Sequence, residues 1–205
     1  MKKCFIFAGG DFDGFYEKIN EDDLVIGADK GYQYALAENI PLDYIIGDFD
    51  SADEPEGDNI TVLNPVKDFT DTVAAIELAK EKGYKEIIIY GGLGRRESHT
   101  IANIRSMYFY KNQGLDISLR ARGKKIFIVD DIFTYKHKGK DFYVSIFSLR
   151  DISRGLTIKN LYYELDNYDL AMDSSLGVSN ETCGKDFSIE VKDGVLLVIF
   201  EDFSS

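Results

Sequence analysis

The spacing of apolar residues changes once along this chain, and that change limits the folds it can adopt. Up to about residue 123, short apolar segments alternate with segments of helical length. Apolar segments that alternate with helices are typical of parallel strands covered on both faces. The predicted strands are 4–10, 23–29, 43–49, 59–64, 86–92 and 116–121, and the predicted helices are 31–39, 70–83 and 99–114. We therefore predict an α/β fold with a mostly parallel, doubly wound sheet.

The segment 70–83 has the residues expected at both ends of a helix. Thr70 is a typical N-cap, and Gly83 is typical of the position just after a helix. Between them, Val73, Ile76 and Ala79 recur at helical spacing. The segment is therefore predicted to form a helix with one apolar stripe.

After about residue 123 the pattern becomes that of strands joined by short turns. The segments 124–149, 155–170 and 186–202 are rich in β-branched and aromatic residues. Lys192–Gly194 stands directly before an apolar run and predicts a tight hairpin. We predict an all-β domain for residues 124–205, an antiparallel sandwich or an open barrel, following an α/β domain of residues 1–123.

Charge and composition exclude several classes of protein. The formal charge of −12 argues against a nucleic-acid partner, because neutralising phosphates requires clustered Lys and Arg. The apolar runs are shorter than the roughly 18 residues of a membrane span, and Cys4 and Cys183 stand far apart. We expect a cytoplasmic protein without a membrane segment or a disulfide framework. An acidic chain that handles an anionic substrate must supply local positive charge or a metal ion.

Four motifs follow predicted strands of the first domain. Ligands of doubly wound sheets bind at the carboxyl ends of the strands, so we expect these motifs to meet at one edge. They are ADKG at residues 28–31, GDFDS at 47–51, KDFTD at 67–71 and GGLGRRESH at 91–99.

The carboxylates of these motifs suggest a cation site. Asp48 and Asp50 are two positions apart, so in extended chain they point to the same side, and Mg²⁺ suits such a pair. The alternative is a loop with Asp at turn positions. Asp71 supplies a third carboxylate, although an acid in a first helical turn is also favoured by the helix dipole. Asp68 is either a further site residue or a turn residue.

The glycine-rich turn at 91–99 suggests a phosphate site. Glycines let backbone N–H groups approach phosphate oxygens, and Arg95 and Arg96 can add charged contacts. The alternative is a tight turn with Ser98 as N-cap and both arginines at the surface. His99 and His137 are the only histidines, too few and too far apart for a metal site. The chain thus has carboxylates that can bind a divalent cation and, further along, a loop that can bind phosphates. This combination indicates phosphoryl or diphosphoryl transfer from a nucleotide.

The four motifs, in this order and spacing, resemble those of the thiamin pyrophosphokinase family. The segment SSLGVSNE, residues 174–181, resembles the thiamin-binding part of the same family. The resemblance implies diphosphoryl transfer from ATP to the hydroxyl of thiamin, giving thiamin diphosphate and AMP, with Mg²⁺. It also implies that residues 1–123 are the catalytic, ATP- and Mg-binding domain and 124–205 the thiamin-binding domain. The implied assembly is a homodimer with its active site between subunits.

The resemblance also implies roles for individual residues. Those implied to hold Mg²⁺ are Asp48, Asp50 and Asp71, which together with Arg96 form the catalytic set. Those implied to bind the nucleotide and its diphosphate are Asp29, Lys67, Asp68, Thr70, Arg96, His99 and Asn103. Those implied to contact thiamin are Ser179 and Asn180.

The chain departs from the family pattern in three places. The family loop usually reads GGxGGRxDH, whereas this chain has Arg95 in place of a glycine and Ser98 in place of an acid. Some relatives stack thiamin on a Trp, and this chain has none. Two alternative functions are another nucleotide-dependent small-molecule kinase and a non-catalytic module that binds thiamin or nucleotide.

Overall fold

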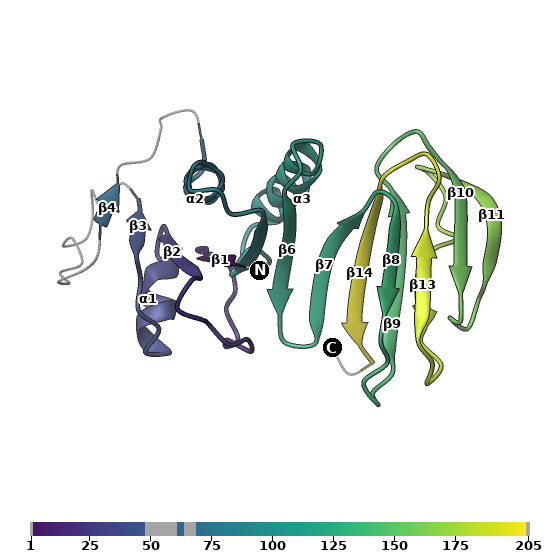
Figure 1. Ribbon diagram of the computed structural model, residues 1–205, viewed down its shortest axis with the longest axis horizontal. Helices are drawn as coiled ribbons and strands as arrows, with labels where there is room; N and C mark the ends of the chain where they lie inside the picture. The colour runs from purple at the N-terminus through teal and green to yellow at the C-terminus, as the bar shows by residue number, and fades with distance from the viewer. Residues whose placement is uncertain (1, 48–60, 64–68, 204–205) are drawn as a thin grey trace. The chain divides into compact units, whose positions relative to one another are not determined.

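The computed structural model describes residues 2–47, 61–63 and 69–203. The chain forms two compact units, Met1–Arg122 and Gly123–Ser205 (Figure 1). Four of the predicted site residues, Asp48, Asp50, Lys67 and Asp68, lie outside the described residues.

The first unit contains a parallel sheet, as predicted. Its strands are β1 (Lys3–Phe7), β2 (Leu24–Ala28), β3 (Tyr44–Ile46), β4 (Thr61–Leu63), β5 (Glu86–Tyr90) and β6 (Asp116–Ala121). They lie in the order β6-β5-β1-β2-β3-β4, and each of these neighbouring pairs is parallel. Successive strands are added on one side of β1 up to β4, and β5 returns to its other side. The order therefore reverses between β1 and β5, which is where doubly wound sheets bind ligands.

Helices complete this unit. They are α1 (Gly31–Ala37), α2 (Asp71–Glu81) and α3 (Glu97–Lys111). One sheet face packs Phe5, Phe7 and Tyr90 against Ala35 of α1. Residues of β1 alternate between faces, so Ile6 points to the opposite side. Helix α2 contacts β1, β2 and α3; in its predicted apolar stripe Ile76 and Ala79 are buried and Val73 is half-buried. The doubly wound α/β prediction is confirmed.

Helix α2 has the ends that were predicted, whereas α3 does not begin at Ser98, the N-cap that one interpretation of the sequence assigned to it. Thr70 caps α2, its Oγ1 accepting from the Val73 N–H at 3.3 Å, and Gly83 follows with φ +77°. Helix α3 begins at Glu97 with Arg96 in the N-cap position. The Arg96 carbonyl already accepts from the N–H of His99 at 3.0 Å. The alternative with Ser98 as N-cap is therefore wrong, because the helical hydrogen bonds start two residues earlier.

The second unit is a β-sandwich, as predicted. Its strands are β7 (Lys124–Val129), β8 (Ile132–Tyr135), β9 (Phe142–Ser148), β10 (Ile152–Lys159), β11 (Leu165–Ala171), β12 (Asn180–Glu181), β13 (Phe187–Glu190) and β14 (Leu196–Asp202). Antiparallel pairing gives one layer in the order β12-β9-β14-β7 and another in the order β11-β10-β13-β8. Val144 and Val198 from the first layer join Leu156 and Ile189 from the second in one buried core.

The predicted hairpin at Lys192–Gly194 is wrong. Strand β13 pairs with β10 and β8, and β14 pairs with β7 and β9, so the turn passes from one layer to the other. The N–H groups of Lys192 and Asp193 donate to the Arg154 carbonyl at 3.1 and 3.2 Å. Burial of both flanking strands on opposite sides of one core overrides the local preference for a hairpin.

Two further expectations can be checked in this structure. Within the described residues, no helix is long and apolar enough to cross a membrane. Cys4 and Cys183 are both free thiols, the first buried in β1 and the second exposed.

Candidate functional site

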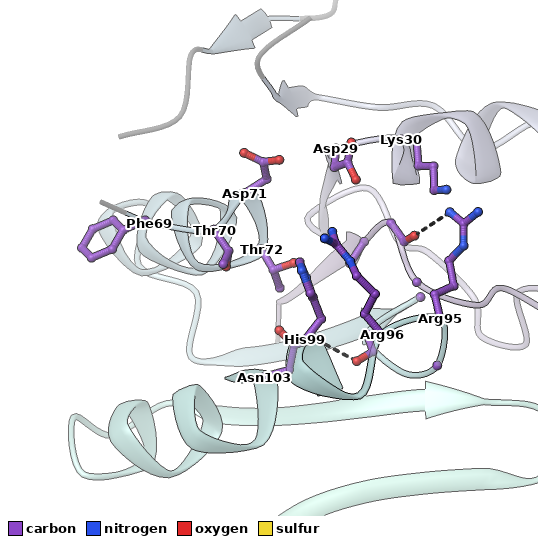
Figure 2. Close-up of a pocket in the computed structure, with 16 residues that line it drawn as sticks. Asp29, Lys30, Phe69, Thr70, Asp71, Thr72, Arg95, Arg96, His99 and Asn103 are labelled. Atoms are coloured by element: carbon purple, nitrogen blue, oxygen red, sulfur yellow. Dashed lines mark hydrogen bonds between the residues drawn. The ribbon is translucent and has the colours of Figure 1, made fainter. Parts of the chain in front are cut away.

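A cavity of about 670 Å³ lies where the sheet order reverses. Its walls come from the loops after β1, β2 and β5 and from the first turns of α2 and α3 (Figure 2). The lining residues are Ala8, Gly9, Gly10, Asp29, Lys30, Phe69, Thr70, Asp71, Thr72, Gly91, Gly92, Gly94, Arg95, Arg96, His99 and Asn103. Every predicted nucleotide-site residue that the structure describes is among them.

The loops after β1 and β5 are hydrogen-bonded to each other beneath the cavity. The Gly10 N–H donates to the Gly91 carbonyl at 2.7 Å, and the Asp11 N–H donates to the Leu93 carbonyl at 2.8 Å. Gly91 has φ +66°, and a Cβ at this position would overlap the Ala8 carbonyl oxygen. Glycine is needed here both for the left-handed backbone and for the close approach of two strand ends.

Asp29 reaches the cavity through an uncommon backbone conformation. Its φ is +52°, and its N–H donates to the Ile46 carbonyl at 2.8 Å, which continues the β2–β3 pairing. A Cβ on Gly9 would lie 2.5 Å from Oδ2 of Asp29. Gly9 therefore leaves the space that the Asp29 carboxylate occupies. Asp tolerates the left-handed region better than most residues.

The first turn of α2 contributes Thr70, Asp71 and Thr72. Figure 2 shows Asp71 and Thr72 on the cavity side of the helix and the ring of Phe69 turned away. The Thr70 hydroxyl oxygen is used as the helix cap. Thr72 was not predicted from the sequence. Because Thr72 follows the helix-start acid directly, its place in the first turn is the signal that could have identified it.

The glycine-rich turn before α3 places Arg96, His99 and Asn103 differently. Arg96 and His99 are exposed, and Figure 2 shows the Arg96 guanidinium extending into the cavity. Asn103 is only 8% exposed, and its Nδ2 donates to the Gly92 carbonyl at 2.7 Å. The Asn103 amide therefore holds the turn in place from below.

Arg95 occupies the position where the family pattern has glycine, and its backbone explains that preference. Its φ is +56°, a conformation that costs a non-glycine residue about 1 kcal/mol. Its Nη1 donates to the Gly9 carbonyl at 3.4 Å, and its N–H donates to Oδ2 of Asp11 at 3.3 Å. The side chain thus contacts the loop after β1.

The loop after β1 was missed in the sequence analysis. Tyr34 of α1 donates its hydroxyl to the Gly10 carbonyl at 2.9 Å and stacks on Phe12 with ring centroids 4.9 Å apart. Burial raises the pKa of Tyr34, and the nearby carboxylates of Asp11 and Asp29 raise this pKa further, so the hydroxyl remains a donor. The signal available in the sequence was the glycine pair at the end of the first strand.

The donor set of the cavity fits Mg²⁺. Asp29 and Asp71 both line it, and Mg²⁺ is usually held by one or two protein carboxylates together with waters and substrate phosphates. The part of the chain that the structure describes has no cluster of three or more His, Cys, Asp or Glu side chains arranged for a metal. Asp48 and Asp50, two of the three predicted ligands, lie outside that part.

The predicted thiamin contacts lie in the second unit, around β12. Ser179 is exposed with φ +55°, and its N–H donates to Oγ of Ser145 at 3.1 Å. Asn180 is 6% exposed. Its Oδ1 accepts from the N–H groups of Tyr163 and Glu181, both at 2.9 Å, and its Nδ2 donates to the Tyr163 carbonyl at 2.7 Å. Asn180 therefore fixes the segment that carries the exposed ring of Tyr163.

Two family models match separate parts of the chain. Residues 15–119 match the family model of the thiamin pyrophosphokinase catalytic domain. Residues 131–196 match the model of the thiamin pyrophosphokinase vitamin B1 binding domain.

Similar proteins cover nearly the full chain. A thiamine pyrophosphokinase of Bacillus subtilis is 30% identical over 97% of this chain and 98% of its own length. A crystal structure of thiamine pyrophosphokinase from Bacillus subtilis matches with a TM-score of 0.88 at 25% identity, covering 99% of this chain and 100% of that one. A thiamin pyrophosphokinase structure from Geobacillus thermodenitrificans shares the fold, with a TM-score of 0.87 at 24% identity over 100% and 99% of the two chains. The chain therefore belongs to the thiamin pyrophosphokinase family of enzymes.

Proposed function

We propose that the protein transfers a diphosphoryl group from ATP to the hydroxyl of thiamin, forming thiamin diphosphate and AMP. Family membership supports this reaction. The observation that carries the proposal is the cavity at the sheet reversal, which combines carboxylates with an arginine at a helix start. A triphosphate with a bound cation needs both kinds of group.

The cationic side of the cavity is proposed to hold the phosphates. Arg96 stands at the N-cap of α3, where backbone N–H groups and the helix dipole add to its charge. Lys30 and His99 line the same space. Asn103 supports the turn through Gly92. Lys67 and Asp68 complete the proposed nucleotide site, together with Asp29 and Thr70.

The acidic side is proposed to hold the metal. Asp71, with Asp48 and Asp50, would bind Mg²⁺. When bound, Mg²⁺ neutralises phosphate charge and so makes the β-phosphorus more open to attack. Asp29 lies on the same cavity, with its carboxylate held above Gly9.

Catalysis is proposed to rest on positioning. The thiamin hydroxyl oxygen loses its proton to water and forms a bond to the β-phosphorus of ATP, while the bond from that phosphorus to the oxygen of AMP breaks. The protein's part is to orient the phosphates for in-line attack, which Arg96 and the start of α3 can do from fixed backbone positions.

The second unit is proposed to bind thiamin through Ser179 and Asn180. The backbone of Tyr163 bonds to Asn180 and that of Tyr162 to Glu181, and the exposed rings of these two tyrosines can provide the stacking surface for which this chain has no Trp. The proposal includes a cytoplasmic homodimer whose active site is formed between subunits. Sedimentation analysis of the purified chain tests the dimer.

Product analysis tests the proposed reaction. The chain is incubated with ATP, thiamin and Mg²⁺, and the nucleotides and thiamin esters are separated by chromatography. We expect AMP and thiamin diphosphate in equal amounts. ADP with thiamin monophosphate would overturn diphosphoryl transfer, and binding without turnover would indicate the non-catalytic module.

Asp71→Asn provides the matching variant. We expect it to abolish turnover with little change in thermal midpoint, because residue 71 is in the first turn of α2 and only half-buried. Asp22→Asn, an exposed acid just before β2, is the control and should retain activity. Full activity of Asp71→Asn would contradict its proposed place in the metal site.

A further inference from the structure

We propose that Arg95 and Asp11 are positioning residues that hold the turn 91–96 in the conformation that directs Arg96 at the phosphates of ATP. The inference rests on the proposed function. It assigns Arg95 a task different from the phosphate contact that its sequence position suggested, and it assigns a task to Asp11, which no motif contained.

The side chains of Arg95 and Arg96 point to different places. Figure 2 shows the Arg96 guanidinium in the middle of the cavity and that of Arg95 at the loop after β1. There, Nη1 of Arg95 donates to the Gly9 carbonyl at 3.4 Å. A guanidinium that already contacts a backbone carbonyl is directed away from the space where Arg96 lies.

Asp11 holds the other side of the same turn. Its backbone N–H donates to the Leu93 carbonyl at 2.8 Å, and its Oδ2 accepts from the Arg95 N–H at 3.3 Å. Its carboxylate also packs so closely on Gly94 that a Cβ there would overlap Oδ2. Asp11 therefore contacts three consecutive residues of the turn, 93 to 95.

The support beneath Asp11 is fixed as well. Tyr34 donates its hydroxyl to the Gly10 carbonyl at 2.9 Å, and Phe12 stacks on the Tyr34 ring. The residues on both sides of Asp11 are thus attached to α1. A rigid support allows Asp11 to determine the path of the turn instead of following it.

The backbone conformation of Arg95 explains why the turn depends on these contacts. Its φ of +56° is a conformation that L residues with a Cβ disfavour, so the turn stays there only while other contacts hold it. Arg96 comes next, with extended φ and ψ of −126° and 115°. If residue 95 left the left-handed region, the start of α3 and the direction of Arg96 would change with it.

Three substitutions at position 95 separate the possible roles. Arg95→Ala removes the guanidinium contact, and alanine disfavours the left-handed φ as arginine does. We therefore expect residue 95 to leave the left-handed region and the turn to change conformation. Arg95→Gly removes the same guanidinium but accepts the left-handed φ freely. Arg95→Lys keeps a positive charge without the planar donor group. Arg105→Ala, at an exposed position of α3, is the control.

Binding of α,β-methylene-ATP with Mg²⁺, measured by calorimetry, is the readout, with KM and kcat for ATP measured alongside. We expect Arg95→Ala to weaken binding about tenfold, while Arg95→Gly stays within about twofold of the original chain. A direct phosphate contact predicts equal losses for the two variants and near-normal binding for Arg95→Lys. Unchanged binding of the analogue by Arg95→Ala would mean that Arg95 contributes to stability and not to ATP binding. Either result overturns the inference.

Asp11→Ala tests the second member of the pair. It should weaken binding of the analogue about tenfold in the original chain and clearly less in the Arg95→Gly background, where glycine adopts the left-handed φ without strain and the turn depends less on Asp11. Equal losses in both backgrounds would overturn the coupling between residues 11 and 95. Thermal midpoints of all variants identify any that fail to fold.

The outcome can be separated from that of the proposed function. If the chain binds the analogue but forms no AMP from ATP and thiamin, diphosphoryl transfer fails and the affinities still test the pair. If the original chain does not bind the analogue, the inference fails with it.

Discussion

Replacing Gly91 by alanine tests whether the close approach of β1 and β5 builds the site. Gly91 has φ +66°, and a Cβ would overlap the Ala8 carbonyl oxygen. Gly114 is the matched control, because its φ is +80° and a Cβ there would have no described atom beyond its chain neighbours within 4 Å. Both substitutions introduce a left-handed alanine, which costs about 1 kcal/mol in the folded chain. In both, the stiffer unfolded chain offsets about 0.4–1 kcal/mol of that cost.

The expected difference between the two variants follows from the contacts. For Gly114→Ala we expect a net loss of about 0–1 kcal/mol. In Gly91→Ala the Ala8 backbone must move, and such overpacking adds about 1–3 kcal/mol. The same movement strains the bond from the Gly10 N–H to the Gly91 carbonyl, worth about 1 kcal/mol. Gly91→Ala should therefore be less stable than Gly114→Ala by about 2–4 kcal/mol.

Amide hydrogen exchange is the appropriate assay, because two compact units can unfold in separate transitions. Exchange of the β1 and β5 amides gives the opening free energy of this sheet directly. The strands of the second unit serve as an internal reference that neither substitution should change. Equal destabilisation by Gly91→Ala and Gly114→Ala would refute the idea that the close approach to Ala8 matters.

Two other changes test local contacts. Thr70→Ala removes the cap of α2 and should lower stability by about 1 kcal/mol, whereas Thr70→Ser should retain the cap, as judged by urea unfolding. The pKa of Asp141 is lowered, first by the Gly184 N–H and then by the Thr182 hydroxyl and His137. Because the folded pKa lies below the unfolded value of about 3.9, its stabilisation is present above that pH and is lost as the pH falls through the folded value. The stability advantage of the original chain over Asp141→Asn should therefore shrink below about pH 4. A constant difference between pH 7 and pH 3 would contradict this assignment.

The sequence predicted elements whose signals are local. The strands of the first unit are apolar nearly throughout, and a strand of the structure overlaps each predicted segment. Helix α2 has its cap at Thr70 and its following glycine at Gly83, as expected. Placement at strand ends then brought Asp29, Asp71 and Arg96 to one cavity, since parallel strands present their carboxyl ends on the same edge.

The features that escaped prediction depend on contacts between distant residues. Lys192–Gly194 has the composition of a hairpin turn, but the partners of β13 and β14 lie elsewhere in the chain. Asp11 contacts Arg95 across 84 positions of sequence. The family resemblance implied ligand contacts for Asn103 and Asn180, and it gave no sign that their amides bond to backbone groups that only the folded chain brings near. Residue type and spacing alone do not contain this information.

The negative charge of the chain is compatible with an anionic substrate such as ATP, because charges far from the cavity have little effect there. A formal charge of −12 repels ATP, but exposed charges are screened beyond about 8 Å at physiological salt. Groups that line the cavity therefore dominate: Lys30, Arg96 and the start of α3 bring positive charge, and Asp29 and Asp71 bring negative charge. The two carboxylates oppose a bare triphosphate and favour one that brings a cation. On the proposed function, the acidic side of the cavity thus selects the magnesium complex of ATP, while the turn held by Asp11 and Arg95 presents the arginine that binds it.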